Sequence, residues 1–348
     1  GRVLVSGGLS EFGEMGASSE IYNPSTESWN SLTYLEVPRQ GHAATKLSDG
    51  RILVTGGQPD EDFAEVFDPS NSFWYPAGDM EIGRVKHTAT LLPDGRVAIV
   101  GGADNQAPFN SVEFYNTVTS RWVSGPFIGT WTPGPSLSQQ RASHTTTELK
   151  DGRILVVGGR TRTEGTSGPG SGHTLFLDSV EIYEPATGQW YSAKELGNRR
   201  GGHNASLLQD GRVLVTGGRT LTKFKADDEH RDIIYASSTE IYNPSTNMWS
   251  AVDPMPEARW EHTSTVLQDG KVLVTGGFNG QSSALASADI FDPATNKWTS
   301  TGNLIVGREG HKAVLMNNGQ VMLIGGWNTD LVETYDPITG QWSEAGTL

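Results

Sequence analysis

The chain has 348 residues, of which 43 are Gly and 17 are Pro, and only 19% are charged. Its apolar runs of four or five residues are broken by Gly, Asp and Asn, which excludes long helices and any stretch of the roughly 18 apolar residues that a membrane span needs. The net charge of −14 disfavours nucleic acid and anionic membranes as partners, so we expect neither nucleic-acid binding nor membrane insertion. The absence of Cys removes disulfides, thiolate metal sites and cysteine nucleophiles, and it fits either a reducing or an oxidising compartment.

One unit recurs along the chain, beginning with the apolar run Val3-Leu4-Val5. Each unit has an apolar run that ends in Gly-Gly, an acidic residue two positions before an aromatic one, and a Trp seven residues after that aromatic. The Gly-Gly pairs begin at Gly7, Gly56, Gly101, Gly158, Gly217, Gly276 and Gly325. The acidic residues are Glu20, Glu65, Glu113, Glu181, Glu240, Asp289 and Glu333. The tryptophans are Trp29, Trp74, Trp122, Trp190, Trp249, Trp298 and Trp342.

An Arg-x-x-His segment lies between successive units and occurs six times. Its arginines are Arg39, Arg84, Arg141, Arg200, Arg259 and Arg308. An Asp-Gly or Asn-Gly pair follows each segment and predicts a tight type I′ hairpin, in which both central residues have positive φ. Each unit therefore predicts a four-stranded antiparallel meander, with strands A to D, in which the arginine pairs with the acidic residue of strand C. We expect these pairs, the histidines and the tryptophans to hold the blades together.

Units of about 45 to 59 residues with four strands are typical of β-propeller blades. The prediction is an all-β, seven-bladed propeller that forms a single domain over residues 1–348. Strand A of blade one would have to precede Gly1, so blade one is expected to be incomplete, with three strands. On this count we expect the chain to be a segment of a longer protein.

These repeats resemble the kelch repeat, in the form found in the central propeller of the galactose oxidase superfamily. Propellers of this kind include enzymes, lectins and protein-binding adaptors. The copper-radical oxidases of that superfamily use a Tyr directly before a strand-A His, and a second Tyr cross-linked to Cys. Here the residues before the six histidines are Gly41, Lys86, Ser143, Gly202, Glu261 and Gly310, and Cys is absent. The resemblance therefore implies the scaffold, without radical copper chemistry and without a cofactor.

Three insertions depart from the repeat. The spacing from the repeat Trp to the Gly of the next turn is 21 residues, as from Trp29 to Gly50, but 30 residues from Trp122 to Gly152. We assign this excess to the D–A loop between blades three and four, within residues 124–140, which contains the additional Trp131. The B–C loops of blades four and five, residues 160–178 and 219–236, are also long. The prediction is that all three loops meet on one face.

The residues directly after each Gly-Gly pair should form a ring near the axis on that face. Two arginines and two aromatic residues of this ring, with neighbouring side chains, could hold a carboxylate or a sugar ring. The candidate ligand-binding residues are Arg160, Arg219, Trp260, Glu261, Phe278, Trp327 and Trp131. A weak metal candidate consists of Asp227, Asp228 and Asp232, although a solvated acidic loop explains these residues better.

The leading hypothesis is a non-catalytic binding scaffold. It would present the D–A and B–C loops of blades three to five to a protein, peptide or glycan partner. The alternative is a carbohydrate-active propeller, either a lectin or an enzyme resembling sialic-acid mutarotases, that acts on an anionic sugar in the axial pocket. The resemblance to mutarotases would imply six blades and a different set of axial residues, which favours the first hypothesis. No P-loop, nucleophile elbow or metalloprotease helix occurs in the sequence.

Overall fold

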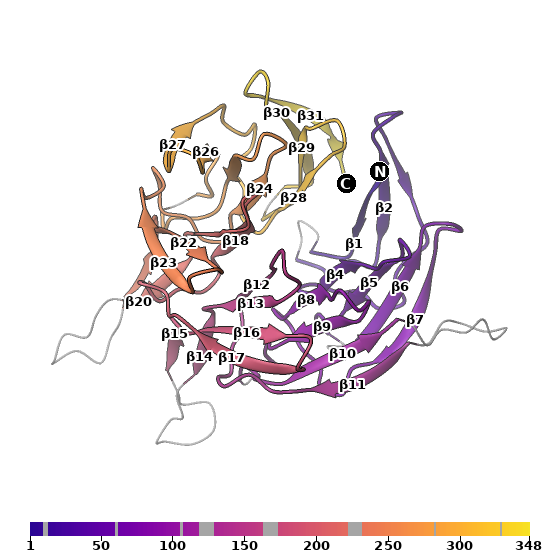
Figure 1. Cartoon of the computed structure of the whole chain (residues 1–348). Helices are drawn as coiled ribbons and strands as arrows, with labels where there is room; N and C mark the ends of the chain where they lie inside the picture. The colour runs from indigo at the N-terminus through magenta and orange to yellow at the C-terminus, as the bar shows by residue number, and fades with distance from the viewer. Residues whose placement is uncertain are drawn as a thin grey trace.

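Seven antiparallel sheets surround a common axis in the computed structural model of the protein (Figure 1). The structure describes residues 1–9, 13–59, 62–104, 107–117, 129–162, 173–221, 232–281, 283–327 and 329–348. Six sheets have four strands and the first has three, which confirms both the seven-bladed propeller and the incomplete blade one. Within the described ranges, no helix is long and apolar enough to cross a membrane.

The blades follow one another in chain order, and in blades two to seven the first strand of each lies at the axis beside the first strands of its neighbours. Blade one contains β1 (Val3–Ser6), β2 (Ser19–Asn23) and β3 (Ser28–Ser31). Blade two contains β4 (Ala43–Lys46), β5 (Ile52–Thr55), β6 (Phe63–Asp68) and β7 (Phe73–Asp79). Blade three contains β8 (Thr88–Leu91), β9 (Val97–Val100), β10 (Val112–Asn116) and β11 (Thr130–Gly134). Blade four contains β12 (Thr145–Glu148), β13 (Ile154–Val157), β16 (Val180–Glu184) and β17 (Gln189–Ala193).

The remaining blades repeat this plan. Blade five contains β18 (Asn204–Leu207), β19 (Val213–Thr216), β22 (Thr239–Asn243) and β23 (Met248–Val252). Blade six contains β24 (Thr263–Val266), β25 (Val272–Thr275), β26 (Ala288–Asp292) and β27 (Lys297–Ser300). Blade seven contains β28 (Lys312–Leu315), β29 (Val321–Ile324), β30 (Leu331–Asp336) and β31 (Gln341–Thr347). Two additional hairpins pair β14 (Arg160–Arg162) with β15 (Thr174–Phe176), and β20 (Arg219–Leu221) with β21 (Ile233–Tyr235).

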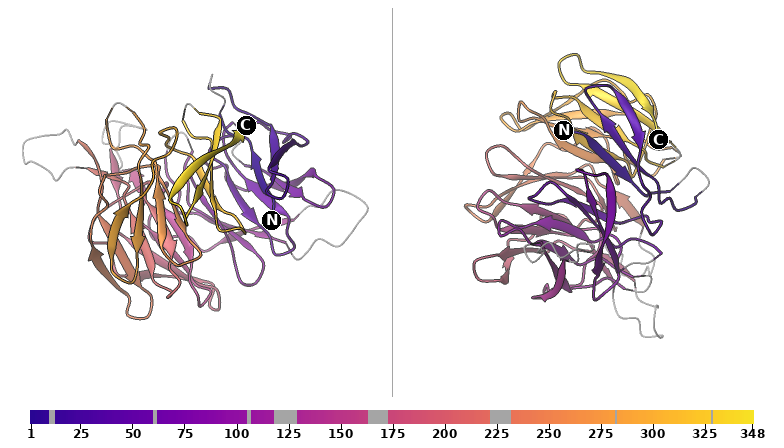
Figure 2. Two further views of the ribbon diagram at one scale, coloured as in Figure 1. Left: turned by 90° about the horizontal axis from the view of Figure 1, so that it is seen from above. Right: turned by 90° about the vertical axis from the view of Figure 1, so that its right-hand side faces the viewer.

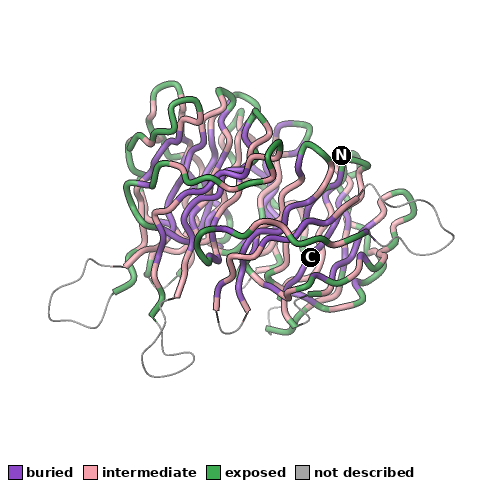
Figure 3. Tube along the Cα trace, turned by 60° about the horizontal axis from the view of Figure 1, so that its bottom comes forward, coloured by how far each residue is buried: buried purple, intermediate pink, exposed green. Residues whose placement is uncertain are grey.

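The hydrophobic core lies between neighbouring blades, because each sheet is apolar on both faces of its middle strands. The strand-B segments of blades three to seven are fully buried, as in Val213–Thr216. Six buried clusters each join two neighbouring blades, from the pair of blades two and three to the pair of blades seven and one. The chain ends are close in space, as Figures 1 and 2 show, and the Trp29 indole donates to the carbonyl of Ala345 at 3.1 Å. Figure 3 shows the buried segments running through the inside of the ring.

The predicted turn type between strands A and B is wrong. In each of these turns only the glycine has positive φ, for example 91° at Gly50, and its N–H donates to the carbonyl of Leu47 at 3.0 Å. The N–H of Leu47 in turn donates to the carbonyl of Arg51. This is a three-residue loop that ends in a left-handed glycine, not a two-residue type I′ turn.

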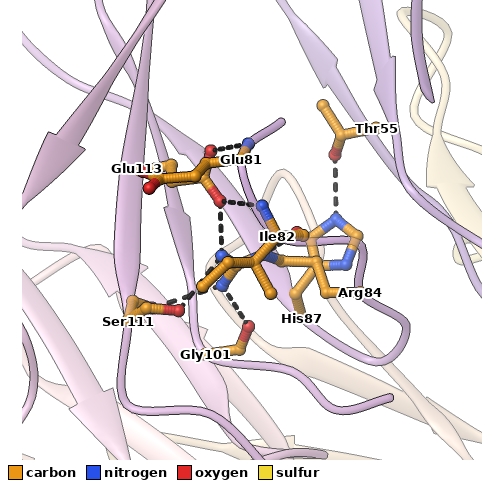
Figure 4. Close-up of polar contacts among 8 residues, drawn as sticks. All are labelled: Thr55, Glu81, Ile82, Arg84, His87, Gly101, Ser111 and Glu113. Atoms are coloured by element: carbon orange, nitrogen blue, oxygen red, sulfur yellow. Dashed lines mark hydrogen bonds and ion pairs between the residues drawn. The ribbon is translucent and has the colours of Figure 1, made fainter. Parts of the chain in front are cut away.

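The predicted Arg–acid pairs are present in all six blades that contain an Arg-x-x-His segment. In blade three, Arg84 donates to Glu113 Oε1 at 2.5 Å and to the carbonyl of Gly101 at 2.7 Å (Figure 4). The second oxygen of Glu113 accepts the backbone N–H of Glu81 at 2.7 Å. All six arginines are at most 1% exposed. Each pair therefore joins strand C of a blade to the segment that leads into strand A of the same blade.

The repeat Trp of blade three is Trp131, not Trp122, which corrects the sequence assignment. Trp131 lies in β11 opposite Tyr115 of β10, with ring centroids 5.0 Å apart, as in the other blades. Its indole donates to the carbonyl of Ala77 in blade two at 3.1 Å, the same bond to the preceding blade that Trp29 makes. From Trp131 to Gly152 the spacing is again 21 residues. Trp122 lies outside the described residues.

Candidate functional site

The two inserted hairpins, β14–β15 and β20–β21, lie side by side next to blades four and five (Figure 1). Each begins directly after a Gly-Gly pair, so that its first residue, Arg160 or Arg219, lies near the axis. The contact between β15 and β20 confirms that these two insertions meet. The third insertion does not join them. Because β11 contains Trp131 and is strand D of blade three, the additional residues fall between β10 and β11 in the sequence and lie outside the described residues.

A ring of backbone surrounds the axis at the level of the residues that precede the six histidines. All six residues have left-handed backbone, although only three of them are glycines; they are Gly41, Lys86, Ser143, Gly202, Glu261 and Gly310. The N–H of Ser143 donates to the carbonyl of Lys86 at 3.2 Å, and the N–H of Gly202 donates to the carbonyl of Ser143 at 2.8 Å. Consecutive blades are thereby joined at the axis, and the three non-glycine side chains extend from this ring.

Lys86, Arg160, Arg219, Trp260 and Glu261 form one group at the axis, which we call the axial cluster. The Arg219 guanidinium lies over the Trp260 ring at 4.1 Å. Burial, followed by the charge of Arg160, lowers the pKa of Lys86, and burial raises the pKa of Glu261 against the opposing charges of Lys86 and Arg219. Lys86 and Glu261 belong to blades three and six, so their charges interact across the axis. The structure therefore brings together four of the predicted residues.

The cations of the axial cluster are not neutralised by contact with an acid. Within the part of the chain that the structure describes, Lys86, Arg160 and Arg219 form no ion pair with a carboxylate, in contrast to the six blade arginines. Arg160 Nε is buried without a hydrogen-bond partner. Burial, followed by the charge of Arg219, lowers the pKa of Arg160. The cluster thus holds three cations against the Glu261 carboxylate. Lys312 and Glu309 are further charged neighbours of that carboxylate, so cations remain in excess, an arrangement that suits an anionic ligand group.

Glycine at position 202 is required by the cluster. A Cβ atom there would lie 2.2 Å from the Trp260 indole nitrogen, and the backbone has φ of 63°. The indole therefore lies directly against the Gly202 backbone, while Arg219 covers its face. Trp260 is held in place from two sides, as a recognition residue should be.

Three of the predicted residues, Phe278, Trp327 and Trp131, are not part of the axial cluster. Phe278 packs edge-on against Tyr235 of β21 at 5.4 Å, next to the axial cluster through its backbone bridge to Trp260. Trp327, in blade seven, is 63% exposed, and its backbone N–H donates to the carbonyl of Glu309. Trp131 is part of β11 and of the contact between blades two and three, so it does not lie on the hairpin face.

No metal site is built from the residues that the structure describes, in which no three His, Asp or Glu side chains come together. Asp227 and Asp228 lie outside the described residues, whereas Asp232 is described. Five of the six histidines have Nε2 on a threonine hydroxyl, such as His144 on Thr88 at 3.0 Å, and no Tyr precedes any of them. These residues do not fit the copper site of the radical oxidases.

Sequence reasoning missed Lys86 and Ser143 as candidates. Of the residues that precede a histidine, only Glu261 was predicted to belong to the site. The signal was present in the repeat, because three blades have Gly at this position and three have a side chain. A side chain where other repeats use Gly makes this position a candidate for a functional role.

Comparisons with known proteins place the chain among kelch propellers. A family model described as the KLHDC2/KLHL20/DRC7 Kelch-repeats domain matches residues 1–218 and 143–347. Kelch-like protein 24 of Homo sapiens is 33% identical over 129 residues, or 37% of this chain and 18% of that protein. Beta-scruin of Limulus polyphemus is 26% identical over 147 residues, or 42% of this chain and 14% of that protein. The chain thus spans less than a fifth of these relatives.

Among solved structures, a fungal alcohol oxidase of the AA5 family in complex with copper superposes with a TM-score of 0.71. The match covers 94% of this chain and 68% of that one, at 20% sequence identity. At this identity the likeness shows the propeller fold alone.

Proposed function

Because the chain belongs to the KLHDC2/KLHL20/DRC7 Kelch-repeats domain family, we propose that it is a non-catalytic protein-binding propeller. The partner docks on the face that carries the hairpins β14–β15 and β20–β21, and it places an acidic group in the axial cluster. The D–A loop between blades three and four borders this face, because Gln139 and Gln140 line one cleft with Leu175 and Phe176 of β15 and the residues that follow it.

The observation that carries this proposal is the excess of unpaired cations in the axial cluster. The chain as a whole has a net charge of −14, so a group of three cations is a local reversal of its charge. A cation removed from water without a counter-charge costs free energy, and a bound carboxylate would offset that cost. Arginine forms bidentate hydrogen bonds to carboxylates, which adds orientation to attraction.

Backbone strain at Lys86 and Glu261 supports the same proposal. Their φ values are 55° and 52°, in the left-handed region that non-glycine residues avoid. Such residues cost on the order of 1–3 kcal/mol each. Gly41, Gly202 and Gly310 occupy the same position in other blades without this cost. Ser143 has the same left-handed backbone, with φ of 53°, at the equivalent position of blade four. We infer that Lys86 and Glu261, the two charged residues among these three, offset this cost through what they bind.

The hairpins supply the apolar part of the docking face. Ile233 and Ile234 of β21 are 49% and 44% exposed, and Tyr235 packs against Phe278 beside the axial cluster. Exposed apolar side chains that border a charged centre are typical of protein-binding surfaces. A partner that covers β21 would reach the axial cluster with an adjoining acidic side chain.

A peptide library displayed on phage tests this function without knowledge of the natural partner. Panning on the immobilised chain should enrich peptides that contain Asp or Glu. The Arg160→Ala/Arg219→Ala variant should lose these peptides, whereas Lys297→Ala, which removes an exposed cation of the outer strand β27, should retain them. Enrichment of the same peptides by both variants would refute the axial cluster as the binding site. A glycan array that instead shows tight binding of sialylated sugars would favour the carbohydrate alternative.

A further inference from the structure

Ser143 occupies a strained backbone position that carboxylate binding by the axial cluster does not explain. It is the third non-glycine residue of the ring before the histidines, with φ of 53°, where Gly41, Gly202 and Gly310 lie in other blades. A left-handed non-glycine residue costs free energy, and Ser143 has no charge with which to attract an anion. Its side chain is half-buried, and within the described chain its hydroxyl makes no hydrogen bond. Ser143 therefore places a hydroxyl without a partner at the axis.

Backbone hydrogen bonds place Ser143 among the cations of the axial cluster. Its N–H donates to the carbonyl of Lys86 at 3.2 Å, so Ser143 lies next to that residue of blade three. The preceding residue, Ala142, exchanges two backbone hydrogen bonds with Arg160, at 2.8 and 3.0 Å. Arg219 makes the same pair of backbone bonds in blade five, at 3.0 and 3.1 Å. Three consecutive blades thus contribute hydrogen-bond donors around one place at the axis.

The three cations are close enough to act on one another. Burial, followed by the charge of Arg160, lowers the pKa of Lys86, and the charge of Arg219 adds to this effect. Burial, followed by the charge of Arg219, lowers the pKa of Arg160. Like charges that converge in this way repel one another, and an anion that contacts all three would relieve the repulsion.

The excess charge at the axis is larger than one carboxylate neutralises. The charged groups are the cations Lys86, Arg160, Arg219 and Lys312 and the carboxylates Glu261 and Glu309. Four cations against two carboxylates leave two positive charges. Burial raises the pKa of Glu261, so its carboxyl takes up a proton more readily than an exposed glutamate and repels a bound anion less. A phosphoryl group carries about −1.5 to −2 charges at pH 7 and three acceptor oxygens, and it matches this excess better than a carboxylate does.

We propose that the axial cluster, together with Ser143, binds a phosphorylated serine or threonine of the partner polypeptide. This inference rests on the proposed function and names the acidic group that the partner carries. Arg160 and Arg219 donate hydrogen bonds to the phosphoryl oxygens, and Lys86 supplies a point charge. The Ser143 hydroxyl donates one further hydrogen bond. The exposed isoleucines of β21 favour a polypeptide over free phosphate, because they offer an apolar surface to the residues that flank the phosphorylated one.

Synthetic peptide libraries with one fixed central residue test this proposal without knowledge of the partner. Three libraries carry phosphoserine, Asp or Ser between random residues, and the fraction of each that is retained on the immobilised chain is measured. The phosphoserine library should be retained at least about tenfold more than the Asp library, and the Ser library least. Equal retention of the phosphoserine and Asp libraries above the Ser library would overturn the phosphoryl assignment and leave the proposed function standing. Equal retention of all three libraries, or retention of none, would overturn both.

Ser143→Gly tests the hydroxyl with a single phosphopeptide isolated from the retained library. Glycine has the conformation of this position in three other blades, so stability should be unchanged or raised. The variant should bind the phosphopeptide about tenfold more weakly, as expected for loss of a hydrogen bond to a charged group, and its Asp counterpart within about twofold of the unaltered chain. Lys297→Ala, which removes an exposed cation of β27, should bind both peptides as the unaltered chain does.

Two results would contradict parts of this proposal. An equal loss of affinity for both peptides in Ser143→Gly, or no loss for either, would overturn the role of the hydroxyl. Full displacement of the phosphopeptide by an equal concentration of inorganic phosphate would overturn the assignment to a polypeptide and indicate a site for free phosphate.

Discussion

At the scale of single residues, the repeat separates side chains that hold the blades from side chains that remain available for a ligand. The arginines of the six Arg-x-x-His segments are buried and paired, and this role could be predicted from the sequence because arginine and acid recur at fixed positions. The axial cluster could be predicted in part. Arg160 and Arg219 stood out after Gly-Gly, but Lys86 lies in a repeat motif that looks purely structural. Its difference shows in the sequence as a side chain where three other blades have Gly, and the left-handed backbone gives the physical reason.

Replacement of Arg84 by Ala should destabilise the protein by about 3–5 kcal/mol, because it leaves the Glu113 carboxylate buried without its counter-charge. Chemical denaturation monitored by tryptophan fluorescence measures this loss. The matched control is Arg199→Ala, which removes an arginine that is 60% exposed and paired with Asp178. That change should cost less than about 1 kcal/mol. Similar losses for the two variants would contradict the structural role of the buried pairs.

The buried histidines should make the fold sensitive to mild acid. Burial, with the nearby arginine charge, lowers the pKa of His87, His144, His262 and His311 to about 3, and that of His42 to about 4. In the unfolded chain these groups take up protons below about pH 6.5. The unfolded state then binds more protons than the folded state, so stability falls as the pH decreases from about 6.5 towards 4.

Melting temperatures measured between pH 7.5 and pH 4.5 check this expectation. The decrease should begin near pH 6.5, above the range in which ordinary carboxylates titrate. A melting temperature that stays constant down to pH 5 would show that the histidines are not buried in their neutral form.

At the scale of elements, the order and type of strands could be predicted because turn residues and apolar runs alternate with a fixed spacing. Two errors have a physical origin. The Asp-Gly pairs were assigned a two-residue turn, whereas the hairpin has three loop residues and places only the glycine in the left-handed region. Blade three contains two tryptophans, and local spacing favoured Trp122, although pairing with Tyr115 and packing on blade two select Trp131. Contacts between distant residues decided what spacing alone could not.

The hairpins β14–β15 and β20–β21 can be removed with little effect on the fold. Their strands form separate two-stranded sheets and add nothing to the ladders of blades four and five. Replacement of residues 161–175 and 220–234 by short turns should change the melting temperature by only a few degrees. The shortened protein should no longer bind the acidic peptides selected on the intact chain. Unchanged peptide binding, measured by fluorescence polarisation, would show that the hairpins take no part in docking.

At the scale of the whole molecule, seven blades are arranged so that one face carries both hairpins and the axial cluster. The number of blades and the three-stranded blade one followed from counting repeats, because each Gly-Gly pair, acid and Trp marks one sheet. The local excess of positive charge at the axis could not be predicted by counting repeats. It arises because Lys86, Arg160, Arg219 and Glu261, from blades three to six, are brought to one end of the ring by closure.

The central claim is that the charged side chains of the axial cluster serve binding and not folding, and Lys86→Gly tests it most directly. Glycine has the conformation of this position in three other blades. Thermal denaturation and peptide titration of the same preparation should therefore show stability unchanged or raised by up to about 3 kcal/mol, because glycine removes the cost of the left-handed backbone, and affinity for the selected acidic peptide at least about tenfold weaker. A variant that loses stability as Arg84→Ala does, while its affinity for the peptide stays the same, would contradict the claim.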